Sequence, residues 1–292
     1  MMDLTRRRRF FAEEIEAVCR LRSPLLVDAL ADVPRERFLR PGPWTIVADG
    51  ELGFSTIKTR TTADADPARI YHNVAVAIDP DRQLFNGQPG TLAAWIDTLD
   101  IGPGARILHV GCGLGYYTAV LARCAGPSGR VLALEADAAL AADARANLAS
   151  MPWVEVRHDQ ASGPLDATFD AILVNAGVTH PLDSWLDALS PGGGMILPLT
   201  STMIPMGNVG KGLVFHVTRN KEDQEACAAR ALAVVAIYSA VGVRDEDLNE
   251  RLGKAMMAGP AMWMAVSRLR RDAHDASASC WLHGDGWCLS AL

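Results

Sequence analysis

The chain has 292 residues, of which 49% are hydrophobic and 21% charged, the composition of a soluble globular protein. This length suits one large α/β domain with a smaller addition. The formal net charge of −6 disfavours a function that depends on coating nucleic acid. No apolar run reaches the roughly 18–20 residues that span a bilayer, so no membrane partner is expected.

The first predicted element is helical and covers residues 6–39. Leu26, Ala29 and Leu30 lie at helical spacing within it. The following residues, 41–70, are rich in Pro, Gly, Thr and Asp. This composition predicts a long loop or short strands that lie over another part of the chain.

From Pro89 the pattern changes to short strands that alternate with amphipathic helices. Strands and helices of these lengths predict a parallel sheet with helices on both faces. The predicted helices are 91–99, Tyr116–Ala125, 138–149 and 182–189. The predicted strands are Arg106–Val110, 130–134, Val154–His158, Phe169–Val174 and 195–199, with a turn at 191–194 before the last of them.

The chain beyond residue 200 adds further strands and a tail. Residues 213–218 and 233–238 predict an antiparallel pair at the far edge, which gives a mostly parallel, seven-stranded sheet. In the tail, residues 283–286 predict a hairpin turn between strands at 280–282 and 287–289. The predicted parts are a helical and loop segment that covers a substrate (1–80), a central sheet domain (81–240) and a C-terminal extension (241–292).

A glycine-rich turn follows the predicted strand Arg106–Val110. Gly111, Gly113 and Gly115 form a GxGxG pattern that leads directly into a predicted helix. Such a turn lets a ligand approach the backbone closely. A dinucleotide site requires GxGxxG, with glycine at position 116, but that residue is Tyr116. The spacing therefore favours S-adenosylmethionine, which has no pyrophosphate to hold.

Polar residues at the ends of the next strands extend this pattern. Glu135 lies twenty residues after Gly115, where a carboxylate can accept hydrogen bonds from both ribose hydroxyls. Asp159 ends the following strand, in a position suited to the exocyclic amine of adenine. Asn175 ends the fourth strand, and we expect it to face the same crevice.

Taken together, these motifs resemble the protein-L-isoaspartate O-methyltransferase family over about residues 22–240. The family's VPRExF motif matches residues 33–38, and its glycine loop matches residues 110–116. Residues 169–172 and 189–199 match two further family patterns, the second being LxxGGxxxxP. The resemblance implies a Rossmann-like α/β fold of the class I methyltransferases.

The resemblance also implies an enzyme: an S-adenosylmethionine-dependent O-methyltransferase that releases S-adenosylhomocysteine. Its substrate would be a carboxyl group of a protein or peptide, either an isoaspartyl residue or a peptide that is tailored after synthesis. The cofactor-binding candidates are Gln88, Gly111, Cys112, Gly113, Gly115, Tyr116, Glu135, Ala136, Asp159 and Asn175. The substrate-positioning candidates are Asn86, Gly87, Gln88 and Tyr116, and the catalytic candidates are Asn86, Gly87 and His180.

Three positions depart from the family pattern. Repair enzymes of the family have a serine whose hydroxyl helps to hold the isoaspartyl substrate, and this chain has Gly87 there. The family's histidine on the following helix is replaced by Leu92, and its acid two residues before the glycine loop by His109. We therefore expect the cofactor site to be kept more fully than the preference for isoaspartate.

The expected chemistry depends on the methyl acceptor. A carboxylate, with a reference pKa of about 4, is ionised at neutral pH and needs no general base. An amine or hydroxyl acceptor would require a base, for which His180 and Asp159 are candidates. A nucleic-acid methyltransferase normally has prolines and an aromatic residue after the fourth strand, and residues 175–178 contain neither. The remaining alternatives are a small-molecule N- or O-methyltransferase and a protein that binds S-adenosylmethionine without transferring its methyl group.

The cysteines indicate the compartment. No CxxC pair and no His/Cys cluster with metal-ligand spacing is found in the sequence, so no metal is expected. Glu13 and Glu14 interrupt any apolar segment after the basic run 6–9, which disfavours a secretory signal. Free thiols without such a signal predict a cytoplasmic protein. The six cysteines lie at positions 19, 112, 124, 227, 280 and 288.

Overall fold

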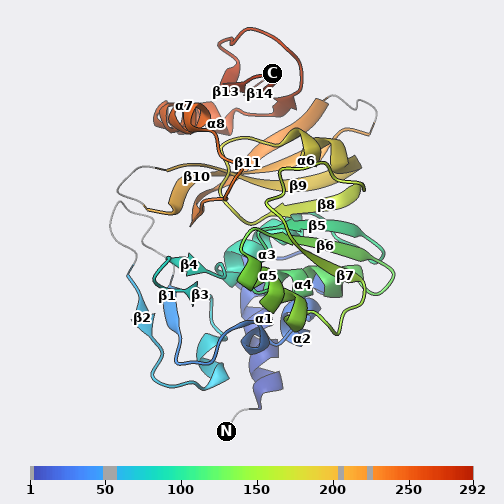
Figure 1. The fold of residues 1–292 in the computed structure, drawn as a ribbon, viewed down its shortest axis with the longest axis vertical. Helices are drawn as coiled ribbons and strands as arrows, with labels where there is room; N and C mark the ends of the chain where they lie inside the picture. Colours follow the sequence, from blue (N-terminus) through green and yellow to red (C-terminus); the bar gives the residue numbers. More distant parts are fainter. Residues whose placement is uncertain (1–2, 49–57, 203–206, 222–225, 292) are drawn as a thin grey trace. The chain divides into compact units, whose positions relative to one another are not determined.

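The structure is a computed structural model, and it describes residues 3–48, 58–202, 207–221 and 226–291. The chain divides into two compact units, Met1–Asp159 and Gln160–Leu292, and Figure 1 labels most of their helices and strands. Among the described residues, no helix is both long enough and apolar enough to cross a membrane.

The first unit begins with two helices and a short 3-10 helix. α1 spans Leu4–Cys19, α2 spans Pro24–Asp32 and η1 spans Arg35–Phe38. The helical segment predicted over 6–39 is therefore interrupted. Arg20 adopts the left-handed conformation, with a φ of 54°, and ends α1.

A small antiparallel sheet follows in the order β2-β1-β3-β4. Side chains of β3 alternate between buried and half-buried, as expected for a strand with one face in the core. The sequence analysis missed β3 and β4, although Val74, Val76 and Ile78 show the alternation of a strand. The elements are β1 (Thr45–Ala48), β2 (Arg60–Thr61), η2 (Pro67–Ile70), β3 (Val74–Asp79) and β4 (Leu84–Phe85).

Three parallel strands in the order β5-β6-β7 complete the first unit. Helix α4 packs on β5 and β6, and α5 packs on β6 and β7. The α/β class predicted from the alternation of strands and helices is confirmed. The bounds are α3 (Pro89–Thr98), β5 (Arg106–Val110), α4 (Tyr116–Ala125), β6 (Arg130–Glu135), α5 (Ala138–Asn147) and β7 (Val154–His158).

The second unit is built on strands in the order β8-β9-β10-β11-β12-β14-β13. β8 and β9 are parallel, and the remaining neighbours are antiparallel. The strands are β8 (Phe169–Val174), β9 (Leu189–Ser201), β10 (Val209–Arg219), β11 (Ala226–Tyr238), β12 (Arg268–Arg270), β13 (Cys280–Gly284) and β14 (Trp287–Ser290). The helices are α6 (Asp183–Ala188), α7 (Glu246–Met257) and α8 (Pro260–Met264).

Two predictions about this unit are confirmed, and two are wrong. The predicted count of seven strands is too low, because β12, β14 and β13 continue the sheet beyond the antiparallel pair. The antiparallel pair is present, with Leu213 of β10 opposite Val234 of β11. The tail hairpin is also present, and Gly284 faces Trp287 across a two-residue turn. The turn expected at 191–194 is absent from this described stretch, because these residues lie within β9 as a register shift against β8.

Candidate functional site

The glycine loop lies beside the end of β6. The backbone N–H groups of Gly111 and Cys112 both donate to the carbonyl of Leu134, at 2.8 and 3.2 Å. The N–H of Gly115 then donates to the carbonyl of Cys112 at 2.9 Å, which closes the turn before α4. These bonds hold the loop against the strand that carries the predicted ribose-binding acid.

Gly113 occupies a tight position of this loop. Its φ is +55°, a conformation that side chains other than glycine adopt rarely. A Cβ atom at this position would lie 3.1 Å from Cδ1 of Ile78 in β3. The absence of a side chain therefore keeps the loop backbone close to the antiparallel sheet.

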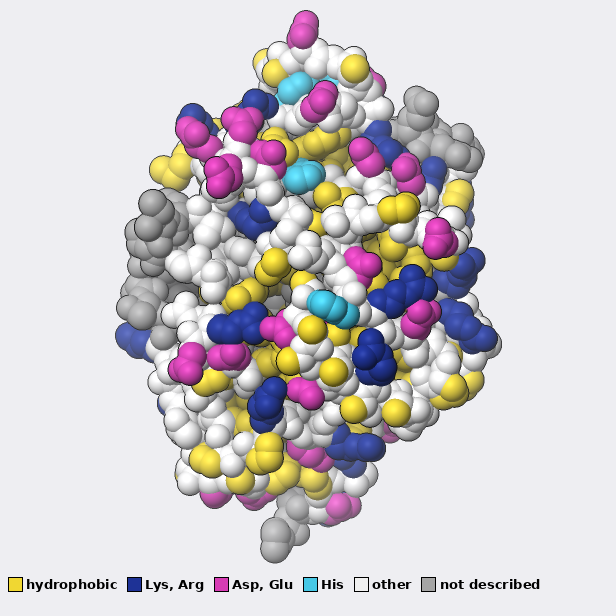
Figure 2. Space-filling model, in the orientation of Figure 1, with side chains coloured by type: hydrophobic (Ala, Val, Ile, Leu, Met, Phe, Trp, Pro, Cys, Tyr) yellow, Lys and Arg dark blue, Asp and Glu magenta, His cyan; other side chains and the backbone are white. Residues whose placement is uncertain are grey.

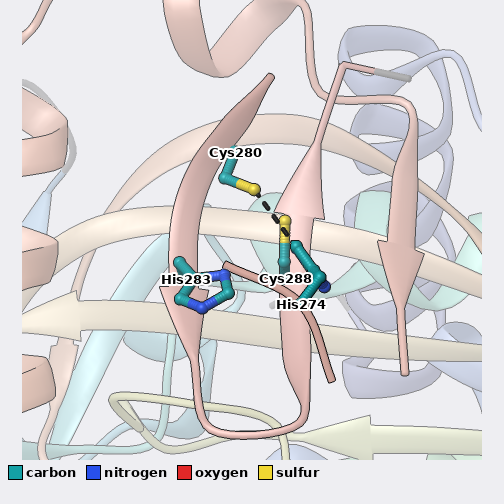
Figure 3. A group of neighbouring side chains, drawn as sticks. All are labelled: His274, Cys280, His283 and Cys288. Atoms are coloured by element: carbon teal, nitrogen blue, oxygen red, sulfur yellow. Dashed lines mark hydrogen bonds between the residues drawn. The ribbon is translucent and has the colours of Figure 1, made fainter. Parts of the chain in front are cut away.

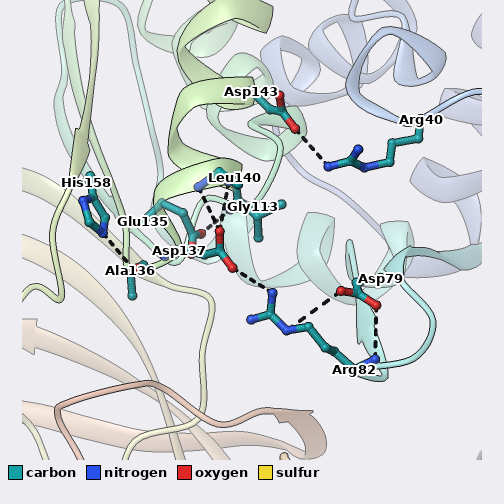
Figure 4. Close-up of polar contacts among 11 residues, drawn as sticks. Arg40, Asp79, Arg82, Gly113, Glu135, Ala136, Asp137, Leu140, Asp143 and His158 are labelled. Atoms are coloured by element: carbon teal, nitrogen blue, oxygen red, sulfur yellow. Dashed lines mark hydrogen bonds and ion pairs between the residues drawn. The ribbon is translucent and has the colours of Figure 1, made fainter.

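Glu135 ends β6, and its side chain is fixed by two backbone groups (Figure 4). Oε2 accepts a hydrogen bond of 2.7 Å from the N–H of Gly113, and Oε1 accepts one of 3.1 Å from the N–H of Asp137. The residue is only 9% exposed. Each carboxylate oxygen can accept more than one hydrogen bond, so both remain able to accept from a pair of hydroxyls. This arrangement fits a ribose.

The sequence analysis missed two charged residues next to Glu135. Asp137 caps α5, because its Oδ1 accepts from the N–H groups of Ala139 and Leu140 at 3.0 and 3.2 Å. Its Oδ2 lies 2.7 Å from Nη1 of Arg82, which follows β3 (Figure 4). The hydrogen bond from Arg82 lowers the pKa of Asp137 below its usual range. An aspartate directly before an apolar helical pattern is the signal that identifies such a cap.

Apolar side chains join the antiparallel sheet to the glycine loop. Ile78 of β3, Leu114 of the loop and Leu140 of α5 form one buried cluster, against which Leu84 packs. The small sheet therefore forms a wall beside the loop, as well as contributing Arg82.

Two further cofactor candidates lie near the end of β6. The carbonyl of Ala136 lies 3.1 Å from Nε2 of His158 (Figure 4). The backbone N–H of Asp159 donates to the carbonyl of Glu135 at 2.9 Å, and the residue is exposed. The structure thus places Asp159 at the strand end next to Glu135, as the sequence pattern predicts.

The substrate candidate Asn86 is buried within the antiparallel sheet. Its Oδ1 accepts from the N–H of Val76 at 3.0 Å and from Nη2 of Arg35 at 3.3 Å. Arg35 is itself fully buried and donates to the carbonyls of Ile70 and Val74, each at 2.6 Å. These bonds give Asn86 a structural role in joining η1 to the sheet.

The next two candidates also bond within the protein. The carbonyl of Gly87 accepts a hydrogen bond of 3.2 Å from the hydroxyl of Tyr117. Gly87 has a φ of +80°, and a Cβ atom there would lie 2.8 Å from Cδ2 of Leu92. Gln88 donates through Nε2 to the carbonyl of Asn73 at 3.1 Å. Leu92 thus fills the space beside position 87.

Tyr116 lies in the core at the start of α4. Its ring packs edge-to-face against Phe38 and Tyr117, with centroid distances of 5.9 and 4.9 Å. The guanidinium carbon of Arg35 lies 5.9 Å from the centre of the same ring. Burial raises the pKa of Tyr116 to about 12, so the hydroxyl stays protonated at neutral pH.

His109, which replaces the family acid, is fully buried in β5. Its Nδ1 lies 2.8 Å from Oγ1 of Thr118, and its Nε2 has no partner among the described residues. Burial lowers the pKa of His109 to about 3, so the imidazole is neutral at physiological pH. The chain therefore has a neutral group two residues before the glycine loop.

Asn175 and His180 belong to the second unit. Asn175 follows β8 and is half-buried. His180 is also half-buried, with Nδ1 2.9 Å from Oγ1 of Thr179. Burial lowers the pKa of His180, although the nearby charge of Asp245 opposes this shift. A neutral imidazole is the form that can accept a proton.

Comparison with known proteins gives a family-level match. The model of the family described as protein-L-isoaspartate(D-aspartate) O-methyltransferase (PCMT) matches residues 58–225. Protein-L-isoaspartate O-methyltransferase 1 of Rhodopseudomonas palustris is 34% identical over 179 residues, which cover 60% of this chain and 61% of that protein. The protein-L-isoaspartate O-methyltransferase of Methanoregula boonei is 32% identical over 160 residues, covering 53% of this chain and 61% of that protein. This chain thus spans about three fifths of the length of these relatives.

Solved structures give the fold. A Plasmodium falciparum structure described as a protein-L-isoaspartate O-methyltransferase in complex with S-adenosyl-L-homocysteine has a TM-score of 0.59 at 17% identity. The match covers 80% of this chain and 97% of that one. Another protein-L-isoaspartate O-methyltransferase structure has a TM-score of 0.56 at 19% identity, covering 84% and 69% of the two chains. The predicted Rossmann-like fold of the class I methyltransferases is confirmed.

Proposed function

Because this chain belongs to the protein-L-isoaspartate(D-aspartate) O-methyltransferase family, we propose that it transfers a methyl group from S-adenosylmethionine to a carboxylate of a protein or peptide. The observation that carries the proposal is the position of Glu135. Its carboxylate is held beside the glycine loop by the N–H groups of Gly113 and Asp137. In this proposal residues 1–80 cover the substrate and residues 81–240 bind the cofactor.

The residues of the first unit fit S-adenosylmethionine. Glu135 offers two oriented oxygens for the ribose hydroxyls. Gly113, at a φ of +55°, would let the ligand approach the backbone of the loop. Asp159, at the next strand end, is suited to the exocyclic amine of adenine. S-adenosylhomocysteine in the Plasmodium relative supports the same cofactor here.

The bound cofactor supplies an electrophilic methyl group on a sulfonium. The protein then has to align an acceptor with that methyl group and exclude water. The buried apolar side chains of Ile78, Leu114 and Leu140 pack along one side of the glycine loop. A carboxylate acceptor is ionised at neutral pH, so the reaction requires no proton transfer by the chain. Asn86 and Gln88 carry amide side chains that bond within the protein, so neither acts as a general base.

The acceptor class follows from the relatives and from Gly87. Isoaspartyl carboxylates are the first substrates to test, because the relatives are named for that activity. A second candidate is another carboxylate on a peptide. Leu92 favours this second candidate, because its side chain occupies the space that the Cβ atom of a serine at position 87 would need.

Charge supports a protein or peptide rather than a nucleic acid as partner. Figure 2 shows Lys and Arg side chains interspersed with Asp and Glu on its face of the described residues. The net charge of −6 also disfavours a nucleic-acid partner.

The cysteines in the described residues are free thiols, which is in keeping with the cytoplasmic location predicted from the sequence.

The test is a transfer assay with methyl-labelled S-adenosylmethionine. The protein is incubated separately with isoaspartyl peptides, with a peptide extract and with RNA. We expect label on peptide that is released by mild base, since methyl esters hydrolyse and N-methyl groups do not. Transfer to the extract but not to isoaspartyl peptides would select the second candidate. Base-stable label on RNA, or cofactor binding without any transfer, would overturn the proposal.

A further inference from the structure

Four side chains with metal-binding atoms come together in the C-terminal part of the second unit (Figure 3). Each offers one ligand atom, and these atoms all lie within 4.8 Å of one another. Both cysteines among them are free thiols. We call this group the tail cluster, and it consists of His274, Cys280, His283 and Cys288.

The β13–β14 hairpin brings three of these residues to one face. His283 lies directly opposite Cys288 in the antiparallel register. In a regular strand, Cys280 and His283 would point to opposite faces because they are three residues apart. A register shift between Cys280 and Leu282 changes this alternation. Accordingly Trp281 and Leu282 are both buried, whereas Cys280 and His283 are half-buried.

The fourth member, His274, comes from the segment before β13. Its Nδ1 lies 3.0 Å from the carbonyl oxygen of Asp272 and 3.4 Å from Oδ1 of the same residue. Its Nε2 lies 3.4 Å from Sγ of Cys280. A histidine whose one nitrogen is held by a carbonyl or carboxylate presents the other nitrogen to a metal, as is usual in zinc sites.

His283 provides an independent indication of a ligand. Its Nδ1 is buried and has no hydrogen-bond partner among the residues that the structure describes. Buried polar atoms are nearly always satisfied by protein, water or an ion. The ring of His283 packs edge-to-face against that of His274, with centroids 4.8 Å apart, so the two imidazoles share the cluster.

The donor set decides which ion fits. Two sulfurs and two imidazole nitrogens suit tetrahedral Zn²⁺, which binds both donor types at about 2.0–2.3 Å. Such bonds separate neighbouring ligand atoms by roughly 3–4 Å. The tail cluster, with its atoms within 4.8 Å, thus reaches this geometry by a small contraction. We propose that one Zn²⁺ ion binds here, with His274, Cys280, His283 and Cys288 as its four ligands.

The site is structural, since four protein ligands leave no open position for a substrate. It joins the segment before β13 to the hairpin. The hairpin itself is anchored elsewhere in the unit, where Nε1 of Trp281 donates to the carbonyl of Ala255 in α7 at 3.2 Å. The ion therefore stabilises the C-terminal extension, independently of methyl transfer.

Metal analysis of the untagged full-length chain tests the proposal. We expect one zinc ion per chain, and at least about a tenfold loss of bound zinc in the double variant Cys280→Ser, Cys288→Ser. The matched control is Cys19→Ser, a half-buried thiol in α1 that lies outside the tail cluster and keeps the zinc content unchanged.

A second measurement uses the unchanged chain, so that misfolding of a variant does not decide the outcome. Zinc is removed with a chelator and replaced by Co²⁺. We expect the visible absorption of tetrahedral Co²⁺ together with a thiolate-to-cobalt charge-transfer band. A chain that takes up no Co²⁺, a double variant that keeps its zinc, or a metal-free Cys280–Cys288 disulfide found by mass spectrometry would each overturn the proposal.

Discussion

At the scale of single residues, Glu135 has the most direct link to the proposed cofactor. Its two oxygens are held by the N–H groups of Gly113 and Asp137. Replacing Glu135 with alanine removes the acceptor for the ribose and leaves these N–H groups without it. We expect Glu135→Ala to weaken S-adenosylmethionine binding by about 1–3 kcal/mol, measured by titration calorimetry.

The matched control for this variant is Glu155→Ala. Glu155 is an exposed acid of β7 in the same unit, paired with Arg157 at 2.6 Å. Its loss removes the same charge from the unit without a contact to the glycine loop, so the affinity of the chain for S-adenosylmethionine should not change. Equal affinities for the Glu135→Ala and wild-type chains would rule out the ribose assignment.

A second prediction concerns how the stability of the chain depends on pH, and it rests on His109. In the unfolded chain a histidine titrates near 6.5, whereas burial lowers the pKa of His109 to about 3. Between these values the unfolded chain binds a proton that the folded chain excludes, so stability falls as the pH drops. From neutral pH to pH 5 this residue should lower the free energy of unfolding by about 2 kcal/mol.

Urea unfolding at the two pH values measures this loss. The variant His109→Gln cannot titrate, so it should lose about 2 kcal/mol less than the wild type over the same interval. An unchanged slope in His109→Gln would mean that His109 is protonated in the folded chain.

At the scale of elements, the connection from β4 to α3 limits how the family's substrate site can be restored. Serine at position 87 must adopt a φ of +80° and place its Cβ 2.8 Å from Leu92. The backbone conformation alone costs about 1–2 kcal/mol. We expect Gly87→Ser to lower stability in urea unfolding and to give no gain in activity on isoaspartyl peptides over the wild type.

The double variant Gly87→Ser, Leu92→His is the informative partner of this change. It removes the leucine side chain that the new Cβ would contact and supplies the histidine of the family pattern. Any gain in isoaspartyl methylation should appear in the double variant and not in the single one. A fully stable and active single variant would show that Leu92 does not restrict this position.

The start of α5 gives a further prediction. Asp137 accepts from two N–H groups of the helix and also pairs with Arg82. Losing the cap in Asp137→Ala should cost about 1 kcal/mol in urea unfolding. Arg82→Ala removes partly exposed ion pairs with Asp137 and Asp79, each worth less than about 1 kcal/mol. If Asp137→Asn, which keeps the cap, is as unstable as Asp137→Ala, the cap is not the source of the effect.

Sequence periodicity predicted some elements well and others poorly. β5, α4, β7 and β8 were predicted with their observed bounds, because the apolar pattern changes sharply at the glycine loop and at neighbouring turns. β9 was predicted too short, because Gly192 and Gly193 resemble a turn while the neighbouring strand holds them in a bulge.

The candidate site likewise contains some features that the sequence predicted and others that it did not. Glu135 and the glycine loop follow from spacing along one chain segment, and the structure brings them within hydrogen-bond distance. Arg82 and the internal bonds of Asn86 depend on contacts between distant segments, which periodicity does not report. The tail cluster was missed for a similar reason, because a register shift in β13 aligns its residues.

At the scale of the whole molecule, the tail continues the sheet of the second unit. Leu269 of β12 pairs with Cys227 of β11 on one side and with Leu289 of β14 on the other. Leu269 and Leu289 are both fully buried. The tail should therefore unfold together with the strands that precede it.

Calorimetric unfolding of Leu289→Ala tests this. Loss of the buried side chain should cost about 2–4 kcal/mol and lower the temperature of the transition that includes β9 to β11. The control, Met264→Ala, changes a side chain that is 69% exposed and should stay within about 0.5 kcal/mol of the wild type. A separate early transition for the tail alone would show that it is an independent subdomain.

The two-residue turn of the tail hairpin has a consequence for chemical ageing. Asp285 and Gly286 are both exposed, and an aspartate followed by glycine isomerises readily because no side chain shields the next peptide nitrogen. Isomerisation would add a methylene to the backbone of the shortest connection in the hairpin. Cys288 would then no longer face His283 in register. Isomerisation at Asp285, the lesion for which the chain's family is named, would thus disturb the register of the tail hairpin during storage.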